Sequence, residues 1–330
     1  MMKNISGLPP RRISVAPMMN RTDRHFRFLA RLVTRHTWLY TEMLVARALV
    51  HGRAERLLDH AVAERPLALQ LGGSEPAVLA QAARIAGEHG YDEVNLNAGC
   101  PSARVTRGRM GACLMREPAL VAECVVAMRA VTPLPITVKT RIGVDHEADF
   151  EFLCRFVEAV AAAGCKTVIV HARKAWLDGV SPKANRTVPP LDYERVYVLK
   201  AHFPQLEIIL NGGIGDLDAA AVALERCDGA MFGRAAYAQP LLLAGADRRF
   251  YGDAHPPPSL GEILAGYLDY LAGQVTTNGI PSAALGHLAG LFTGLPGARL
   301  VRRQLGELAG DRRLVAVERV LAPYLRARAA

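Results

Sequence analysis

The stretch "EIILNGGIGDLDAAAVALERCDGAMFGRAA" (207–236) contains the pattern that decides the fold. A short apolar run ends in two glycines, an alanine- and leucine-rich segment follows, and a second apolar run ends at Gly233 and Arg234. Glycine lets backbone N–H groups approach a phosphate closely, and a helix N-terminus adds a favourable dipole. Two such turns in succession are typical of the last two strands of a (β/α)8 barrel, where they grip phosphate.

Six further apolar runs precede this stretch and are separated by helix-like segments. They are "RISVAP" (12–17), "TWLYTEM" (37–43), "LALQL" (67–71), "DEVNLN" (92–97), "ITVKTR" (136–141) and "TVIVHA" (167–172). The segment "EFLCRFVEAVAAAG" (151–164) ends in glycine, a usual signal for a helix C-terminus. Eight strands alternating with helices predict an α/β protein with a TIM barrel. A doubly wound sheet is the alternative, but eight regular units without an early GxGxxG favour the barrel.

The pattern changes after the barrel, where "HPPPS" (255–259) interrupts the chain. The remaining segments indicate helices, and we therefore expect a barrel domain over residues 1–241 and an all-helical C-terminal domain over residues 242–330. The segments are "LGEILAGYLDYLAGQV" (260–275), "ALGHLAGLFTGLPGARLVRRQLGEL" (284–308) and "RLVAVERVLAPYLRARA" (313–329).

Composition excludes several classes of protein. The 330 residues contain no apolar stretch of the ~20 residues needed to cross a bilayer, and the first residues lack a secretory signal. We therefore expect a soluble cytoplasmic protein with no membrane partner. Six scattered cysteines without CxxC spacing argue against a disulfide framework, and we expect no metal site.

Basic residues are concentrated near the C-terminus. The chain has a formal net charge of +9, and residues 299–328 contain eight arginines against three acidic residues. This distribution fits a polyanionic partner, although a solvated helix face is the alternative interpretation.

Polar side chains stand at the ends of the predicted strands, where barrel enzymes carry their chemistry. Lys139 is one of only six lysines among forty basic residues, which indicates a need for a compact ammonium group there. It could steady an electron-rich ring or form a Schiff base. Gln70 and His171 can hydrogen-bond a planar heterocycle, and Met18 and Met19 offer an apolar surface to a ring.

These motifs resemble the flavin-dependent tRNA-dihydrouridine synthases, over nearly the whole chain. "LNAGCPS" (96–102), "VKTR" (138–141), "HAR" (171–173), "NGG" (211–213) and "GR" (233–234) carry the resemblance, and "HARKAWLDGVSPKANR" (171–186) indicates the A subfamily. Members usually carry aspartate where Asn20 stands, so this chain has one negative charge fewer near the flavin.

The resemblance implies reduction of uridine to dihydrouridine in the tRNA D-loop, at positions 20 and 20a. FMN would be the cofactor, NADPH the electron donor and tRNA the macromolecular partner of a monomeric enzyme. By position, FMN would be held by Pro17, Met18, Met19, Gln70, Lys139, His171, Asn211, Gly212, Gly213, Gly233 and Arg234. The residues implied to contact tRNA are Asn97, Lys183, Arg186, Arg299 and Arg302.

The resemblance also gives Cys100 the role of proton donor. Hydride from reduced FMN would reach C6 of uracil, and the thiol, which is ordinarily protonated at neutral pH, would protonate C5. Three alternatives are a flavoprotein that reduces a free enone or pyrimidine, a Schiff-base lyase that uses Lys139, and a non-catalytic RNA-binding protein.

Overall fold

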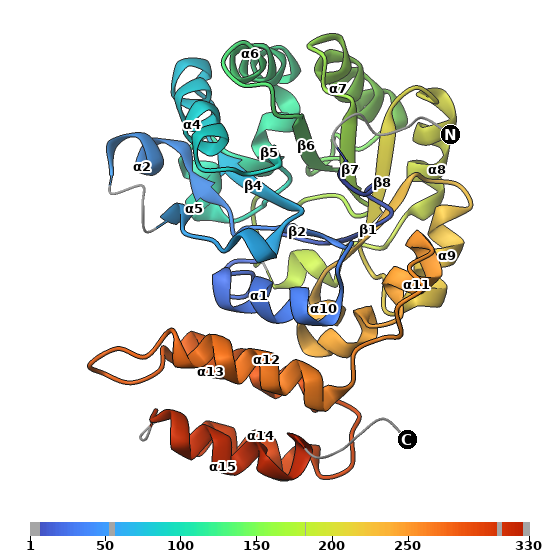
Figure 1. Cartoon of the computed structure of the whole chain (residues 1–330). Coiled ribbons are helices and arrows are strands. Elements are labelled where there is room, and N and C mark those ends of the chain that lie inside the picture. Colours follow the sequence, from blue (N-terminus) through green and yellow to red (C-terminus); the bar gives the residue numbers. More distant parts are fainter. Residues whose placement is uncertain (1–6, 53–56, 182, 309–311, 326–330) are drawn as a thin grey trace.

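Eight parallel strands close into a barrel in the computed structural model, which describes residues 7–52, 57–181, 183–308 and 312–325 (Figure 1). The barrel strands are β1 (Ile13–Val15), β2 (Trp38–Tyr40), β4 (Leu67–Gly72), β5 (Glu93–Ala98), β6 (Ile136–Arg141), β7 (Thr167–His171), β8 (Glu207–Asn211) and β9 (Gly229–Phe232). The pairings of β1 with β9 and of β2 with β4 complete the ring. The predicted TIM barrel is therefore confirmed. A two-residue strand that the pattern does not indicate, β3 (Leu44–Val45), pairs with the end of β4.

Side chains alternate along each strand between the inside of the barrel and the surrounding helices. On β8, Ile208 packs in the large core beneath the helices, whereas Ile209 packs in the inner core together with Ile169. Because the period of a strand is two residues, the parity that places Ile209 and Ile169 inside also directs Asn211 and His171 inward. The core pattern thus positions the polar residues at the strand ends.

Helices cover the outside of the barrel, and many begin at a side-chain cap. They are α1 (Arg24–Val33), α2 (Ala46–His51), α4 (Pro76–Glu88), α6 (Pro118–Arg129), α7 (Phe150–Ala162), α8 (Tyr193–His202) and α9 (Leu217–Leu224). The carboxylates of Asp23, Asp149, Asp192 and Asp216 accept from backbone N–H groups in the first turns of α1, α7, α8 and α9. Each such cap stabilises its helix by ~1 kcal/mol. Gly164 follows α7 with a φ of 92°, as the sequence predicts.

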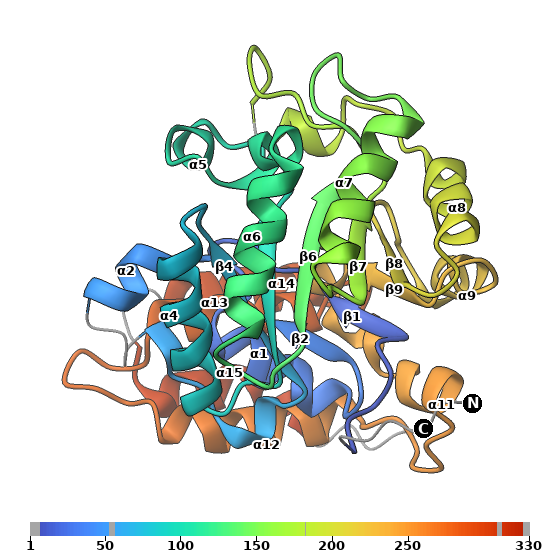
Figure 2. The same cartoon turned by 90° about the horizontal axis from the view of Figure 1, so that it is seen from above.

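Short helical elements follow the carboxyl ends of β5, β7 and β9, and Figure 2 shows α5 at one end of the barrel. They are α5 (Ala103–Arg107) and η2 (Gly111–Arg116) after β5, η3 (Ala184–Arg186) after β7, and α10 (Arg234–Ala238) after β9. At the opposite end lies η1 (Val62–Glu64), which precedes β4.

The C-terminal part of the chain is helical, as predicted, and forms a separate layer next to α1 (Figure 1). After η4 (Pro240–Leu243) and α11 (Ala246–Tyr251) come α12 (Leu260–Ala272), α13 (Ser282–Leu291), α14 (Ala298–Glu307) and α15 (Leu314–Leu325). Tyr270 of α12 stacks on Phe28 of α1 with ring centroids 4.1 Å apart. His287 of α13 lies 2.9 Å from the capping carboxylate of Asp23. The domain boundary at residue 241 stays a prediction.

One expected helical stretch is interrupted in the structure. Residues 284–308 form the two helices α13 and α14, because Gly294 and Gly297 adopt φ angles of 84° and 77°. Such left-handed backbone suits glycine and ends a helix. Of the basic residues near the C-terminus, Arg326 and Arg328 lie outside the described residues.

Candidate active site at the mouth of the barrel

Inward-facing polar side chains meet at the carboxyl-terminal end of the barrel strands, which we call the mouth. Lys139 Nζ donates to Asn211 Oδ1 at 2.8 Å, and Asn211 Nδ2 donates to the carbonyl of Met231 at 2.8 Å. Strand register places Arg141 opposite His171 and His171 opposite Asn211. Residues that are 72 positions apart along the chain therefore form one cluster.

The mouth is electrostatically positive. Burial, together with the nearby charge of Arg141, lowers the pKa of Lys139 to about 7. Burial also lowers the pKa of Arg141 to about 10. The pKa of His171 lies well below its usual value because the ring is buried and faces Arg141 and Lys139. His171 is therefore neutral at physiological pH, and an electron-rich or anionic ligand would relieve the repulsion among the cations.

A row of buried amide side chains crosses β4 and β5 beside this cluster. Gln70 Nε2 donates to Asn95 Oδ1 at 2.7 Å, and Asn97 Nδ2 donates to Gln70 Oε1 at 2.9 Å. Asn97 Oδ1 accepts from the backbone N–H groups of Gly99 and Cys100, at 3.1 and 3.0 Å. The amide row thus links Gln70, a predicted cofactor contact, to the loop that carries Cys100.

Cys100 is half-buried at the edge of the mouth. Its carbonyl accepts from the backbone N–H of Ala112 at 2.9 Å, and a Cβ on Gly111 would lie only 2.4 Å from that carbonyl oxygen. The thiol is close enough for its charge to influence the pKa of Lys139 and of Arg141. The loop therefore holds the sulfur beside cationic groups.

The glycine turns after β8 and β9 differ in their surroundings. Gly212 has a φ of 113°, and a Cβ there would lie 2.6 Å from Cδ2 of His171. Gly213 has a φ of 73°, and its Cβ would lie 2.5 Å from Leu191. Both positions need glycine for the fold itself. A Cβ on Gly233, in contrast, would meet nothing within 4 Å, so the space beside this turn is open.

Several arginines surround this open space. Arg234 Nη2 donates to the carbonyl of Arg186 at 3.2 Å. Burial and the charge of Arg234 lower the pKa of both Arg173 and Arg186, and Arg21 contributes to the effect on Arg186. A group of like charges beside an open glycine turn fits a phosphate, which would neutralise them and accept their hydrogen bonds.

Comparison with known proteins decides the family. The family model for dihydrouridine synthase (Dus) matches residues 14–325. The chain belongs to the dihydrouridine synthase family. A tRNA-dihydrouridine(20/20a) synthase from Shewanella oneidensis is 51% identical over 299 residues, which cover 91% of this chain and 89% of the relative. The proteins of the same name from Synechocystis sp. and Escherichia coli K12 are 52% and 49% identical, over 89% and 90% of this chain and 88% and 86% of the relatives.

Solved structures with similar folds are more distant from this chain in sequence. A morphinone reductase in complex with tetrahydroNAD has a TM-score of 0.51 at 15% identity, covering 80% of this chain and 93% of its own. A 2-naphthoyl-CoA reductase complex has a TM-score of 0.55 at 12% identity, and the match covers 71% of this chain and 49% of the reductase chain. These similarities support the barrel fold.

The residues predicted to contact tRNA lie in three separate places in the structure. Asn97 is buried in the amide row. Lys183 and Arg186 are exposed on the loop after β7. Arg299 and Arg302 are exposed on α14, in the C-terminal helical layer. The structure therefore does not bring the last two to the mouth.

The long loop after β7 is organised by a residue that sequence reasoning did not single out. Asn185 is fully buried, and its side chain donates to the carbonyls of Trp176 and Val180 at 2.8 and 3.1 Å and accepts from the Trp176 N–H at 2.8 Å. Arg141 Nη1 donates to the carbonyl of Asn185 at 3.1 Å. The loop is thereby fixed to the mouth.

The loop after β1 carries the predicted contacts Pro17, Met18 and Met19. Pro17 and Met18 are half-buried, whereas Met19 is 57% exposed and free to contact a ligand. Asn20 adopts a φ of 58°, which asparagine tolerates, and its backbone N–H donates to the Glu42 carboxylate. Burial and the charge of Asp23 raise the pKa of Glu42, and the neutral side chain of Asn20 adds no further negative charge to this loop.

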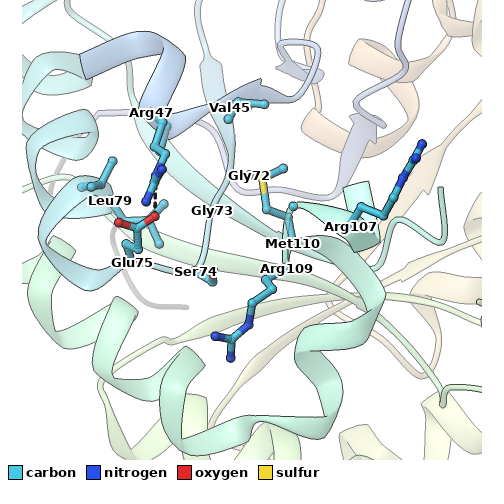
Figure 3. A pocket seen from close by; sticks show the side chains of 13 residues that line it. Val45, Arg47, Gly72, Gly73, Ser74, Glu75, Leu79, Arg107, Arg109 and Met110 are labelled. Atoms are coloured by element: carbon cyan, nitrogen blue, oxygen red, sulfur yellow. Dashed lines mark hydrogen bonds and ion pairs between the residues drawn. The ribbon is translucent and has the colours of Figure 1, made fainter. Parts of the chain in front are cut away.

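A cavity of about 480 Å³ lies beside the mouth and contains none of the predicted site residues (Figure 3). Its walls are the start of α2, the turn after β4 and the turn between α5 and η2. Arg47 and Glu75 point toward each other and form an ion pair at 2.6 Å.

Two kinds of feature are absent from the described ranges. No helix there is both long and apolar enough to cross a membrane. Among the same residues, no three histidine, cysteine or acidic side chains come together as metal ligands would.

Proposed function

We propose that this dihydrouridine synthase reduces uridine to 5,6-dihydrouridine in the D-loop of tRNA, at positions 20 and 20a, with FMN as cofactor and NADPH as electron donor. The observation that carries the proposal is the half-buried thiol of Cys100 at a mouth that also holds the basic side chains of Lys139, Arg141 and Arg186. Identity of about 50% to tRNA-dihydrouridine(20/20a) synthases supports the choice of substrate. We further propose that the enzyme acts as a monomer in the cytoplasm.

The residues at the mouth fit a flavin mononucleotide. Arg234 and the open turn at Gly233 would hold its phosphate, while Lys139, Gln70 and neutral His171 would hydrogen-bond the ring. Pro17, Met18, Met19, Asn211, Gly212 and Gly213 complete the proposed set. When bound, the reduced flavin supplies the hydride that C6 of the uracil ring accepts.

Cys100 would supply the proton for C5 of the uracil. The C5–C6 double bond is conjugated with the C4 carbonyl, so negative charge develops at C5 and O4 and C5 takes the proton from Sγ–H. The cations of Lys139, Arg141 and Arg186 would stabilise the thiolate that remains until solvent reprotonates it. The second N–H of Asn97 Nδ2 is available to a carbonyl of the base.

The backbone of the RNA would lie on exposed basic residues. Lys183 and Arg186 are exposed on the loop after β7, and Arg299 and Arg302, exposed on α14, would extend the contact to the helical layer. Their separation suits a folded tRNA, which can reach the barrel and the helical layer at once. A free pyrimidine would use only the mouth.

The test is to incubate the purified protein with FMN, NADPH and tRNA that lacks dihydrouridine, and to measure dihydrouridine by mass spectrometry. Dihydrouridine at positions 20 and 20a, with none formed from free uridine, is the expected result. Cys100→Ala should keep NADPH-driven reduction of the flavin and lose nearly all dihydrouridine formation. Full turnover by this variant would contradict the role of the thiol, and turnover of free uridine alone would contradict the substrate.

A further inference from the structure

We infer that Glu93, at the amino-terminal end of the barrel, sets the direction of a hydrogen-bond chain that positions the loop carrying Cys100. Glu93 begins β5 and is completely buried, whereas Cys100 follows the other end of that strand. The inference rests on the proposed function only for the chemical role of Cys100.

Both side-chain oxygens of Glu93 accept hydrogen bonds, from Arg11, Tyr40 and Thr137. Arg11 Nε donates to Glu93 Oε2 at 2.6 Å, and Arg11 Nη1 donates to Glu207 at 3.0 Å. Burial acts to lower the pKa of Arg11, but the charges of Glu93 and Glu207 outweigh burial and raise it. The other carboxylate oxygen, Glu93 Oε1, accepts from Tyr40 OH at 3.0 Å and from Thr137 Oγ1 at 2.5 Å.

The direction of every later link follows from this carboxylate. Thr137 has a single hydroxyl proton, which goes to Glu93, so Thr137 Oγ1 can only accept from its next neighbour. It accepts from Asn95 Nδ2 at 2.8 Å. The amide of Asn95 must therefore present its oxygen to Gln70, whose Nε2 donates to it at 2.7 Å.

The same logic continues to the catalytic loop. Gln70 Oε1 is left to accept from Asn97 Nδ2 at 2.9 Å. Asn97 Oδ1 is then free to accept from the N–H groups of Gly99 and Cys100. A reversed chain would turn Nδ2 of Asn97 toward these two N–H groups, and both hydrogen bonds would be lost.

Water cannot easily replace a missing link, because the chain is enclosed in protein. Glu93 and Asn95 are 0% exposed, Gln70 and Thr137 are 1% exposed, and Asn97 is 9% exposed. Glu93, Thr137 and Asn95 are therefore positioning residues, which act on Cys100 through Gln70 and Asn97.

The chain offers a matched set of variants for a test in the full-length protein. Thr137→Val removes a link while keeping shape, Thr137→Ser restores the hydroxyl, and Tyr40→Phe removes a hydrogen bond to the same Glu93 oxygen without touching the chain. Hydrogen–deuterium exchange of peptides spanning residues 97–102 reports the loop, and exchange within β8 reports global stability. Neither measurement depends on flavin, tRNA or turnover.

We expect Thr137→Val to raise amide exchange at Gly99 and Cys100 by about tenfold, the effect of losing roughly one buried hydrogen bond. Tyr40→Phe and Thr137→Ser should exchange like the wild type in this segment, even where Tyr40→Phe lowers Tm. Glu93→Gln, whose amide would face Thr137 because its oxygen is drawn to Arg11, should behave like Thr137→Val.

Unchanged exchange at residues 97–102 in a folded Thr137→Val protein would overturn the inference, and so would an equal rise in Tyr40→Phe. If Thr137→Val unfolds, Glu93→Gln makes the same distinction. Wild-type protein that forms no dihydrouridine, while Thr137→Val shows the expected rise in exchange, would contradict the proposed function and leave the inference about the hydrogen-bond chain intact.

Discussion

Replacing Lys139 by methionine should change the pH dependence of stability in the flavin-free protein. The pKa of Lys139 falls from 10.5 to about 7 on folding, mainly through burial. A tenfold change in proton affinity corresponds to about 1.4 kcal/mol, so keeping this lysine charged in the fold costs about 5 kcal/mol, of which about 4 kcal/mol is lost between pH 6 and pH 10. The penalty is fully present below pH 7, where both states hold the proton. It shrinks as pH rises, because the folded state then releases the proton while the unfolded state retains it.

The stability difference between Lys139→Met and the wild type should therefore shift by about 4 kcal/mol between pH 6 and pH 10, in favour of the variant at low pH. The variant lacks the Lys139–Asn211 hydrogen bond at every pH, so this loss adds a constant to the stability difference and does not change its pH dependence. Urea unfolding followed by circular dichroism gives the difference at each pH, and Lys166→Met, at an exposed lysine, is the control. A difference that stays constant within ~1 kcal/mol across this range would refute the assignment of a desolvated ammonium.

Three further predictions concern ligands and loops. FMN affinity, measured by quenching of flavin fluorescence, should fall by up to tenfold per pH unit above pH 7 in the wild type, because Lys139 is then neutral in the free protein and must take up a proton when FMN binds. In Lys139→Met the affinity should not change with pH, and parallel pH curves for the two proteins would contradict this role of Lys139. Asn185→Ala should speed limited proteolysis within residues 173–190 about tenfold, because buried carbonyl groups lose their hydrogen-bond donor. If the variant is cleaved as slowly as the wild type, Asn185 does not organise this loop. Affinity for tRNA should fall steeply with salt, and Arg299→Gln combined with Arg302→Gln should flatten that slope by about two; an unchanged slope would exclude both from the RNA contact.

Much of the site could be predicted because the alternation of side chains along each strand decides which residues point into the barrel. Gln70, Lys139, His171 and Asn211 stand at strand ends, and closure of the barrel directs all of them to the mouth. The glycines at 212 and 213 were predicted for a phosphate, but the structure adds a second reason, since His171 and Leu191 leave no room for a Cβ.

Other features of the site could not be predicted from a linear pattern. Asn185 lies inside a quoted motif, yet only its burial and its bonds to Trp176 and Val180 show that it organises the loop. Asn97 was predicted as an RNA contact, and its bond to the Cys100 N–H gives it a positioning function as well. The break between α13 and α14 depends on two left-handed glycines within an otherwise helical segment.

The sequence by itself determined the barrel, the order of its strands, the helical C-terminal part and the family, because hydrophobic periodicity and short motifs are local properties of the chain. The tertiary structure alone decided which polar groups pair, how far burial lowers the pKa of Lys139, and where α14 lies relative to the mouth. These depend on distances between residues far apart in sequence and on the exclusion of water, and both arise only when the ring of strands closes.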